Sequence, residues 1–308
     1  MLGPNCEESM FLETGLSAAA SLSATALAIA AFPFGLIIGS FLNVVILRFP
    51  EQLKNSWRRE SEDFLGLSTE PADKTLEPEE DLSLSTPASR CPSCGVPIKP
   101  WHNIPVVSYV LLGGKCKACS TAISIQYPLV ELFSAVATAF IVFQFGLTLM
   151  AAYCLMFTWV LIALTGIDFR EQLLPDQITL PLMWLGLFAN LSGTFVPLNE
   201  AVIGALAGYL SLWSVFWLFK LVTGKEGMGY GDFKLIAALG AWMGWQMLPL
   251  IIILSTFVGA VVGIGGLLLK AREKQMPMAF GPFLAMAGWI ALIWGDKILA
   301  WYLSVFGL

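Results

Sequence analysis

The chain has 308 residues, of which 57% are hydrophobic and only 13% are charged, and its mean hydropathy is +0.75. Soluble domains have about 45–50% apolar and about 25% charged residues, so this composition excludes an ordinary soluble protein. The net charge of −5 gives no support for nucleic-acid binding. Six cysteines do not suggest a disulfide scaffold in a chain of this length.

Long apolar segments dominate the sequence after residues 1–19, which are polar and acidic and lack the basic start of a signal peptide. The segments lie at about 20–47, 127–145, 149–167, 177–195, 199–221, 233–246, 248–269 and 280–303. About 20 apolar residues cross a bilayer. We therefore predict an all-α polytopic membrane protein with about eight transmembrane helices. Segment 233–246 is short, and its cluster of Trp242, Gly244 and Trp245 suggests that it ends at a membrane interface. The alternative is a half-helix in a protein-lined cavity.

Positive charge predicts the orientation, because Lys and Arg gather in the cytoplasmic loops of membrane proteins. If residue 1 is outside, sixteen of the seventeen Lys and Arg residues lie in or beside the inner loops. Only Lys297 lies near an outer end. Both termini are then outside, and the one long polar region is cytoplasmic.

That polar region, 48–125, is expected to form a small cytoplasmic domain between the first span, 1–47, and a seven-helix membrane domain, 126–308. Its first part, 51–86, contains ten acidic residues and only four Lys or Arg, which predicts a flexible insert. Its second part, 87–125, contains no acidic residue and carries two cysteine pairs.

The cysteine pairs, Cys91 with Cys94 and Cys116 with Cys119, have the pattern C-x2-C, a gap of 21 residues, then C-x2-C. Two such turns supply the four sulfurs of a tetrahedral zinc site, which would be closed and structural. The alternatives are a redox pair or unrelated thiols, but the doubled motif favours Zn²⁺. The only histidine, His102, is expected to be a loop residue.

Two aspartates are placed at one membrane depth by the predicted topology. Asp168 ends the third span and Asp232 begins the sixth, both on the cytoplasmic side. A confined carboxylate pair shares one proton and can perform the general acid–base chemistry of an aspartic protease. The simpler alternative for Asp232 is a helix cap after a tight glycine turn.

The neighbourhood of these aspartates suggests further roles. The alternating glycines of 227–231 would let a substrate strand approach the backbone closely. Asp176 follows a proline and is expected to cap the fourth span, with a direct role in the site as the lesser alternative. Glu131 lies just inside the second span, and we expect it to pair with a basic neighbour such as Arg48.

Together these motifs resemble the prepilin peptidases, the leader peptidase/N-methyltransferases of type IV pilus and type II secretion systems. The resemblance extends over most of the chain. The matching segments are Gly39-Ser-Phe-Leu-Asn43, the cysteine block with Asn103-Ile-Pro105, Tyr127-Pro-Leu-Val-Glu131, Ile167-Asp168, Leu174-Pro-Asp176, Gly229-Tyr-Gly-Asp232-Phe-Lys-Leu and Phe280-Gly-Pro-Phe.

The resemblance implies an aspartic endopeptidase of the bacterial inner membrane, with periplasmic termini and a site facing the cytoplasm. Its substrates would be prepilins or pseudopilins, whose basic leader is cleaved and whose new N-terminus is methylated from S-adenosylmethionine. The residues implied by the resemblance are Asp168 and Asp232 for catalysis and Gly114 and Lys115 for methylation. Gly229, Gly231 and Asp176 are our own candidates for substrate binding, from their positions beside Asp232 and Asp168 in the sequence.

Two other classes of protein fit part of the sequence. A proton- or ion-coupled transporter explains the membrane carboxylates, but it leaves the cysteine pairs unexplained and would favour an internal repeat. A non-catalytic scaffold explains the cysteine pairs but not Asp232 behind its glycines. Incubation of the purified protein with a prepilin would separate the three.

Overall fold

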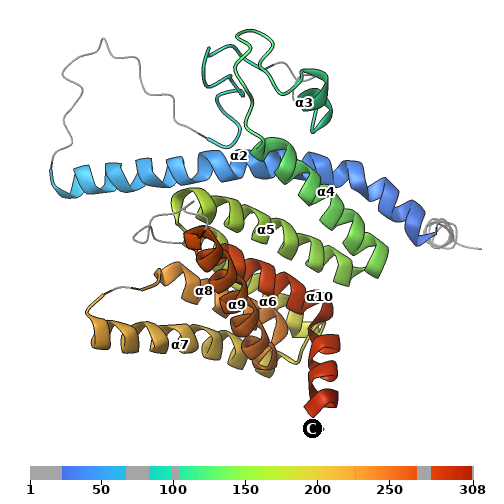
Figure 1. Cartoon of the computed structure of the whole chain (residues 1–308), viewed down its shortest axis with the longest axis vertical. Helices are drawn as coiled ribbons and strands as arrows, with labels where there is room; N and C mark the ends of the chain where they lie inside the picture. The colour runs from blue at the N-terminus through green and yellow to red at the C-terminus, as the bar shows by residue number, and fades with distance from the viewer. Residues whose placement is uncertain (1–22, 67–82, 99–103, 226, 269–278, 307–308) are drawn as a thin grey trace, which may run out of the picture. The chain divides into compact units, whose positions relative to one another are not determined.

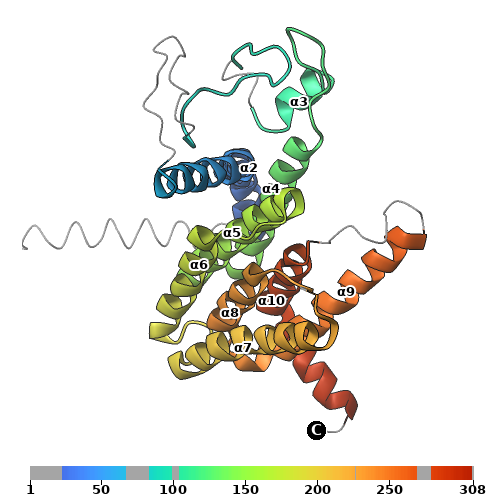
Figure 2. The same cartoon turned by 90° about the vertical axis from the view of Figure 1, so that its left-hand side faces the viewer.

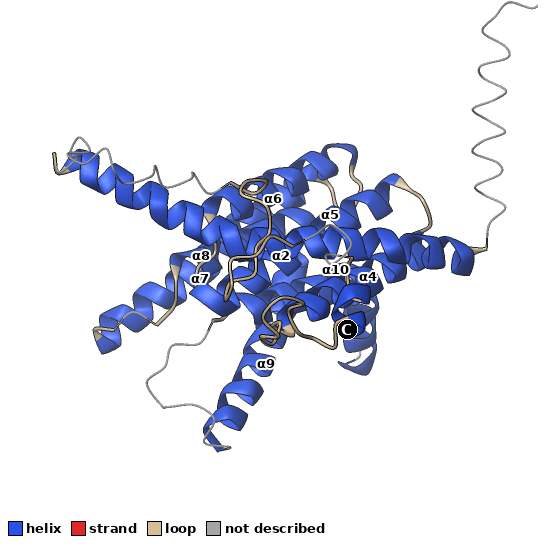
Figure 3. Cartoon of the chain, turned by 90° about the horizontal axis from the view of Figure 1, so that it is seen from above, coloured by secondary structure: helices blue, strands red, loops and turns tan. Residues whose placement is uncertain are grey.

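The computed structural model describes residues 23–66, 83–98, 104–225, 227–268 and 279–306. The polar start at 1–19, residues 67–82 of the acidic insert and His102 lie outside these ranges. The described chain consists of helices and loops, with two isolated β-bridges and no β-strand (Figure 3). The predicted all-α class is therefore confirmed.

The helices occur in the predicted order. They are α2 (Ala24–Phe64), α3 (Val107–Leu111), α4 (Gln126–Phe145), α5 (Leu149–Glu171), α6 (Asp176–Ala189), η2 (Asn190–Ser192), α7 (Leu198–Thr223), α8 (Tyr230–Met243), η3 (Trp245–Met247), α9 (Leu248–Leu268) and α10 (Gly281–Phe306). Within the described ranges, six helices are long and apolar enough to cross a bilayer, namely α2, α4, α5, α7, η3 with α9, and α10. Leu218 on α7 and Phe257 on α9 are exposed, as expected for side chains solvated by lipid. The chain is a multi-pass membrane protein.

Two of the eight predicted spans are shorter helices. α6 and α8 have 14 residues each, which at 1.5 Å per residue gives about 21 Å, less than the hydrocarbon thickness of about 30 Å. From Asp232 to Met243 every residue of α8 except Lys234 is buried. A helix that is apolar all round is typically enclosed by other helices.

α8 lies at the centre of the helices formed by the C-terminal part of the chain. It packs against α7, α6 and α10 (Figures 1 and 2). The C-terminal end of α8 is fixed by Asn190, whose Nδ2 donates to the carbonyls of Ala241 and Trp242 at 3.0 and 3.1 Å. Trp242 is fully buried and donates its Nε1–H to the Leu182 carbonyl at 2.9 Å. The expected interfacial position of Trp242 is therefore wrong: the ring is part of the core between helices.

The chain divides into two compact units, each formed by two segments. One contains Met1–Phe41 and Arg90–Met156, and the other contains Leu42–Ser89 and Phe157–Leu308. In the first unit α2 and α4 approach closely at two glycines. A Cβ on Gly35 would lie 2.6 Å from Ala135 Cα, and one on Gly39 would lie 2.6 Å from Glu131 Cα. Small residues permit this backbone contact, as they do in other membrane helix pairs.

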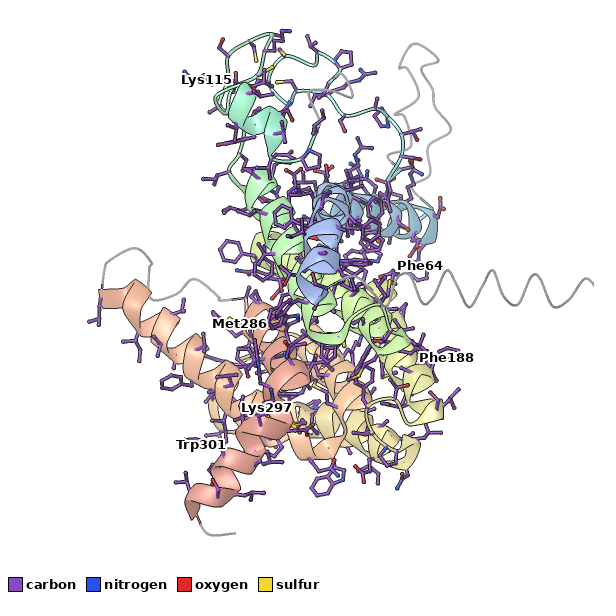
Figure 4. The ribbon with its side chains drawn as sticks, turned by 90° about the vertical axis from the view of Figure 1, so that its right-hand side faces the viewer. Phe64, Lys115, Phe188, Met286, Lys297 and Trp301 are labelled. Atoms are coloured by element: carbon purple, nitrogen blue, oxygen red, sulfur yellow. The ribbon has the colours of Figure 1, made fainter. Side chains whose placement is uncertain are left out.

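α2 continues well beyond its apolar part and ends at Phe64 (Figure 4). Residues 51–64 are therefore helical, whereas the sequence predicted a flexible insert there. The reason is local pairing along the helix, with Arg58 Nε 2.8 Å from Glu62 Oε1 and Ser56 Oγ 3.0 Å from Glu60 Oε1. Pairs at i and i+4 stabilise an exposed helix by a few tenths of a kcal/mol each, about 0.2–0.5.

Candidate active site and metal centre

The two cysteine pairs lie on two turns of the same design. In the first, Cys91 N–H donates to the Val96 carbonyl, and Gly95 N–H donates back to the Cys91 carbonyl. The second turn repeats this pattern from Cys116 to Thr121, with Ser120 in the place of Gly95. Gly95 and Ser120 both have positive φ, 69° and 59°. Each turn therefore directs two thiols to one side.

The four thiols meet in one cluster. The Sγ atoms of Cys91, Cys94, Cys116 and Cys119 all lie within 4.8 Å of one another, and Cys91 Sγ is 3.8 Å from Cys119 Sγ. Thiolates bound to a tetrahedral zinc ion at about 2.3 Å would be separated by about 3.8 Å. Hydrogen bonding with the side chain and backbone of Thr121 lowers the pKa of the Cys119 thiol to about 6. For Cys94, a hydrogen bond with the Val96 backbone is outweighed by desolvation and the neighbouring thiols, which raise the pKa to about 11. The thiolate is the metal-binding form. The cluster fits a metal ion.

Asp168 lies in the last turn of α5 and is buried, with 5% of its surface exposed. Its carboxylate interacts with the backbone N–H of Gly281 at the start of α10. Its Oδ2 atom is buried and has no hydrogen-bond partner among the described residues. A buried carboxylate oxygen without a protein partner is unusual and is available to bind water or a substrate.

Asp232 lies in the first turn of α8 and is also buried, with 7% exposed. Its helix begins after Gly229, which has extended backbone angles of φ −79° and ψ 149°. A Cβ on Gly229 would lie 3.8 Å from Asp232 Oδ2 and would meet nothing else within 4 Å. The backbone before Asp232 is thus open to an approaching chain.

The fold brings the two aspartates together. Both carboxylates are buried in the same compact unit, near enough to each other for an electrostatic interaction. Leu174 packs against the first turn of α8 and the first turn of α10, which touches Asp168. A Cβ on Gly231 would lie 2.7 Å from Leu174 Cβ, and one on Gly281 would lie 3.1 Å from Leu174 Cδ1. Such a carboxylate pair can perform general acid–base chemistry on a peptide bond.

Two family models match consecutive parts of this chain. One is described as the bacterial peptidase A24 N-terminal domain and matches residues 34–145, and the other is described as the type IV leader peptidase family and matches residues 155–264. A prepilin leader peptidase/N-methyltransferase of Pseudomonas aeruginosa is 55% identical over 273 residues, covering 89% of this chain and 92% of the relative. This chain belongs to the type IV leader peptidase family.

Further members of the family are similar over the same extent. The prepilin leader peptidase/N-methyltransferase of Aeromonas salmonicida is 53% identical, covering 89% of this chain and 92% of the relative. Its counterpart of Xanthomonas campestris is 45% identical, covering 91% of this chain and 95% of the relative. No solved structure matches the chain significantly. The resemblance that the cysteine and aspartate motifs suggested is confirmed.

Asp176 does not have the capping role that the sequence suggested. The N-cap of α6 is Pro175, Asp176 is the first helical residue, and no side-chain cap is present. Instead, both carboxylate oxygens of Asp176 accept hydrogen bonds from Lys234 Nζ, at 2.7 and 2.6 Å. The ion pair joins the first turn of α6 to the first turn of α8, two residues after Asp232. The Asp176 side chain therefore links the first turns of α6 and α8, and its expected role in substrate binding stays a prediction.

Glu131 and Arg48, expected to form an ion pair, bind backbone groups instead. Glu131 Oε2 accepts the Val106 N–H at 2.8 Å, and Arg48 donates to the carbonyls of Ser83 and Pro87 at 3.0 and 2.8 Å. Val106 has a positive φ of 58°, which is strained for a β-branched residue. Glu131 thus holds the chain at the point where it enters α3.

Gly114 and Lys115 lie on the tight turn that leads into the second cysteine pair. Gly114 has a positive φ of 68°, and a Cβ there would lie 3.1 Å from the Tyr109 ring. The turn therefore requires glycine for its own geometry. Lys115 is exposed beside the cysteine cluster (Figure 4).

The sequence analysis did not identify Leu174 and Gly281, which lie near the aspartates, or Asn190, which lies at the opposite end of α8. Leu174 and Gly281 lay inside recognised motifs, but no periodicity or charge indicates that they touch the site. Asn190 gave the single signal of a buried amide at the end of an apolar segment. Its contacts with the Ala241 and Trp242 carbonyls depend on chain about fifty residues away, which the local sequence does not reveal.

Proposed function

We propose that this protein is a membrane-embedded aspartic endopeptidase that removes the basic leader from type IV prepilins or type II secretion pseudopilins and N-methylates the new N-terminal residue. The observation that carries the proposal is the meeting of Asp168 and Asp232 in one buried region. Family membership agrees with it, since the similar proteins are named prepilin leader peptidase/N-methyltransferase.

Asp168 and Asp232 supply the cleavage chemistry. Two carboxylates held close together share one proton, because both cannot be ionised at low cost. The ionised carboxylate takes a proton from the attacking water, and the protonated carboxyl polarises the scissile carbonyl. Asp168 Oδ2, which has no hydrogen-bond partner among the described residues, is available for one of these contacts.

The methylation reaction belongs to the cytoplasmic domain, 48–125, with S-adenosylmethionine as methyl donor. This cofactor supplies an electrophilic methyl group to the free amine that cleavage creates. Lys115 is an exposed cation that can bind a carboxylate, and S-adenosylmethionine carries one. Gly114 keeps the turn beside Lys115 in shape.

The protein lies in the bacterial inner membrane, with both termini periplasmic and the aspartate site facing the cytoplasm. The distribution of Lys and Arg supports this orientation. Lys297, the one cation near an outer end, lies on α10 together with the exposed Trp301 (Figure 4). Both residue types are common where a helix leaves the hydrocarbon.

A cleavage assay tests the function. Detergent-purified protein is incubated with a prepilin, first without and then with S-adenosylmethionine carrying a labelled methyl group. We expect a shift in mobility without the methyl donor and incorporation of label only after it is added. A transporter or scaffold would leave the prepilin intact under both conditions.

The four cysteines are proposed to hold one structural Zn²⁺, and Cys94→Ser tests this. The wild-type protein should contain about one zinc per chain, and the variant should contain much less. The cytoplasmic domain of the variant should also be less stable, because metal binding and folding are coupled in such sites. Zinc content and thermal unfolding measure both effects. Cys154→Ala, on a buried cysteine outside the cluster, should keep its zinc. A zinc-free protein of unchanged stability would contradict the proposal.

Substrate is proposed to pass along the open backbone at Gly229 as an extended strand. Within the glycine motif 227–231, only residues 227–229 lie before the start of α8. Gly231 is in the helix and packs against Leu174, so Gly229 is the accessible part of the motif. Gly229→Val should strongly reduce cleavage, because its side chain would occupy the substrate path while its own backbone angles remain allowed.

The control for Gly229→Val is Gly265→Val on α9, where a Cβ meets nothing within 4 Å. Gly265→Val should cleave normally, and both variants should keep their zinc. Gly229→Val should reduce methylation of a synthetic, already cleaved pilin N-terminus less than it reduces cleavage. Normal cleavage with unchanged KM in Gly229→Val would rule out this docking path.

A further inference from the structure

Gly281, the first residue of α10, is in direct contact with the carboxylate of Asp168. A Cβ on Gly281 would lie 2.6 Å from Asp168 Oδ2 and 3.2 Å from Asp168 Cγ. Real Cβ atoms essentially never come this close to another heavy atom, so the carboxylate would have to move. The φ angle of Gly281 is not positive, so space rather than backbone conformation excludes a side chain here.

The first turn of α10 also presents a backbone donor to Asp168. Phe283 and Leu284 donate their N–H groups to the Phe280 carbonyl, and Pro282 has no N–H. That leaves the N–H of Gly281, one of the donors that a helix start cannot satisfy internally, and this group interacts with the Asp168 carboxylate. The oxygen against which a Cβ would press is Oδ2, which has no hydrogen-bond partner among the described residues.

We propose that Gly281 is a positioning residue for the peptidase reaction: its missing side chain lets the Asp168 carboxylate rest against the first turn of α10, which fixes Oδ2 in its reactive orientation. The proposal rests on the proposed peptidase function. It assigns a role in that reaction to the Phe280-Gly281-Pro282 segment, which is more than a hundred residues after Asp168 in the chain.

The test compares Gly281→Ala with Gly288→Ala on the same helix. A Cβ on Gly288 would lie 2.6 Å from Leu239 Cδ2, so the two substitutions introduce equally close contacts, one against the carboxylate and the other against a leucine methyl group. Displacing a catalytic group by about 1 Å costs about 100-fold in rate. We expect Gly281→Ala to lower kcat for prepilin cleavage by about that factor with KM unchanged, and Gly288→Ala to stay near wild type.

Methylation of an already cleaved pilin N-terminus is the internal measure of folding. Gly281→Ala should keep this activity, because the reaction uses the cytoplasmic domain. Loss of methylation in parallel with cleavage would make Gly281 a folding residue and overturn the proposal. Wild-type kcat in Gly281→Ala would overturn it as well. Failure of the wild-type protein to cleave any prepilin would instead refute the peptidase function itself.

A double variant distinguishes the contact of Gly281 with Asp168 from its contact with Leu174, the second neighbour of Gly281. A Cβ on Gly281 would lie 3.1 Å from Leu174 Cδ1, so Gly281→Ala has a second route by which to disturb the site. Leu174→Ala removes that methyl group and leaves the contact with Asp168 unchanged. We expect Gly281→Ala combined with Leu174→Ala to remain as slow as Gly281→Ala. Restored cleavage in the double variant would show that the effect passes through Leu174 and would overturn the assignment.

Discussion

Asp168→Asn and Asp232→Asn should each reduce prepilin cleavage by about 10²- to 10⁴-fold, the range that a positioned acid or base contributes. An amide has nearly the shape of a carboxylate but cannot take part in the proton exchange. Because the two groups act as one unit, the double variant should be no slower than the slower single variant. Initial cleavage rates of the three variants measure this.

Asp296→Asn is the matched control for these substitutions. Asp296 lies on α10 and is exposed, so the same chemical change occurs away from the aspartate pair. It should cleave at the wild-type rate. Substantial cleavage by either Asp168→Asn or Asp232→Asn, in protein that folds normally, would remove that residue from the catalytic pair.

The second large effect is expected where α7 crosses α8. A Cβ on Gly240 would overlap the Gly204 carbonyl, and a Cβ on Gly204 would overlap the Gly240 carbonyl. Gly208 lies one turn further on, and a Cβ there would be 2.7 Å from the Ile236 carbonyl oxygen. Backbone atoms cannot rotate away as a side chain does. Gly240→Ala should therefore destabilise the protein by at least about 1–3 kcal/mol, the usual cost of overpacking.

Thermal unfolding in detergent measures the effect of Gly240→Ala, with Gly265→Ala on α9 as control. A Cβ on Gly265 meets nothing within 4 Å, so the unfolding midpoint of that variant should be unchanged. Because α8 carries Asp232, Gly240→Ala should also lose cleavage activity. A Gly240→Ala protein with the wild-type midpoint would show that the two helices separate at little cost.

The sequence predicted the helices well because their signal is local. Apolar length located all eight segments, and charge bias predicted one orientation for them. The short length of segment 233–246 allowed a half-helix enclosed by protein as one alternative, but the sequence did not show which helices would enclose it. The 14 residues of α8 are as apolar as a lipid-facing span, and only α6, α7 and α10 around it make it a buried helix. Trp242 shows the same limit, since a Trp at a helix end indicates a membrane interface only when no other helix covers it.

The same held for the site: features with a local sequence signal could be predicted, and contacts between distant segments could not. Asp168, Asp232 and the four cysteines could be singled out as candidates because ionisable groups in apolar surroundings and doubled C-x2-C pairs are conspicuous in a sequence. The interactions that position them could not. Lys234 binds Asp176 across 58 residues of chain, and Gly281 reaches Asp168 from more than a hundred residues away. Contacts of this kind depend on how helices pack, which no local pattern specifies.

In the proposed function, Asp168 and Asp232 form one peptidase site that acts on prepilins. The most direct test is the intact mass of a prepilin after incubation with the purified wild-type protein and S-adenosylmethionine, beside an incubation with Asp232→Asn. We predict that the wild-type protein yields a product that has lost its leader and gained one methyl group. Asp232→Asn should leave the full prepilin mass. An unchanged mass with the wild-type protein, or the mature mass with Asp232→Asn, would contradict the claim.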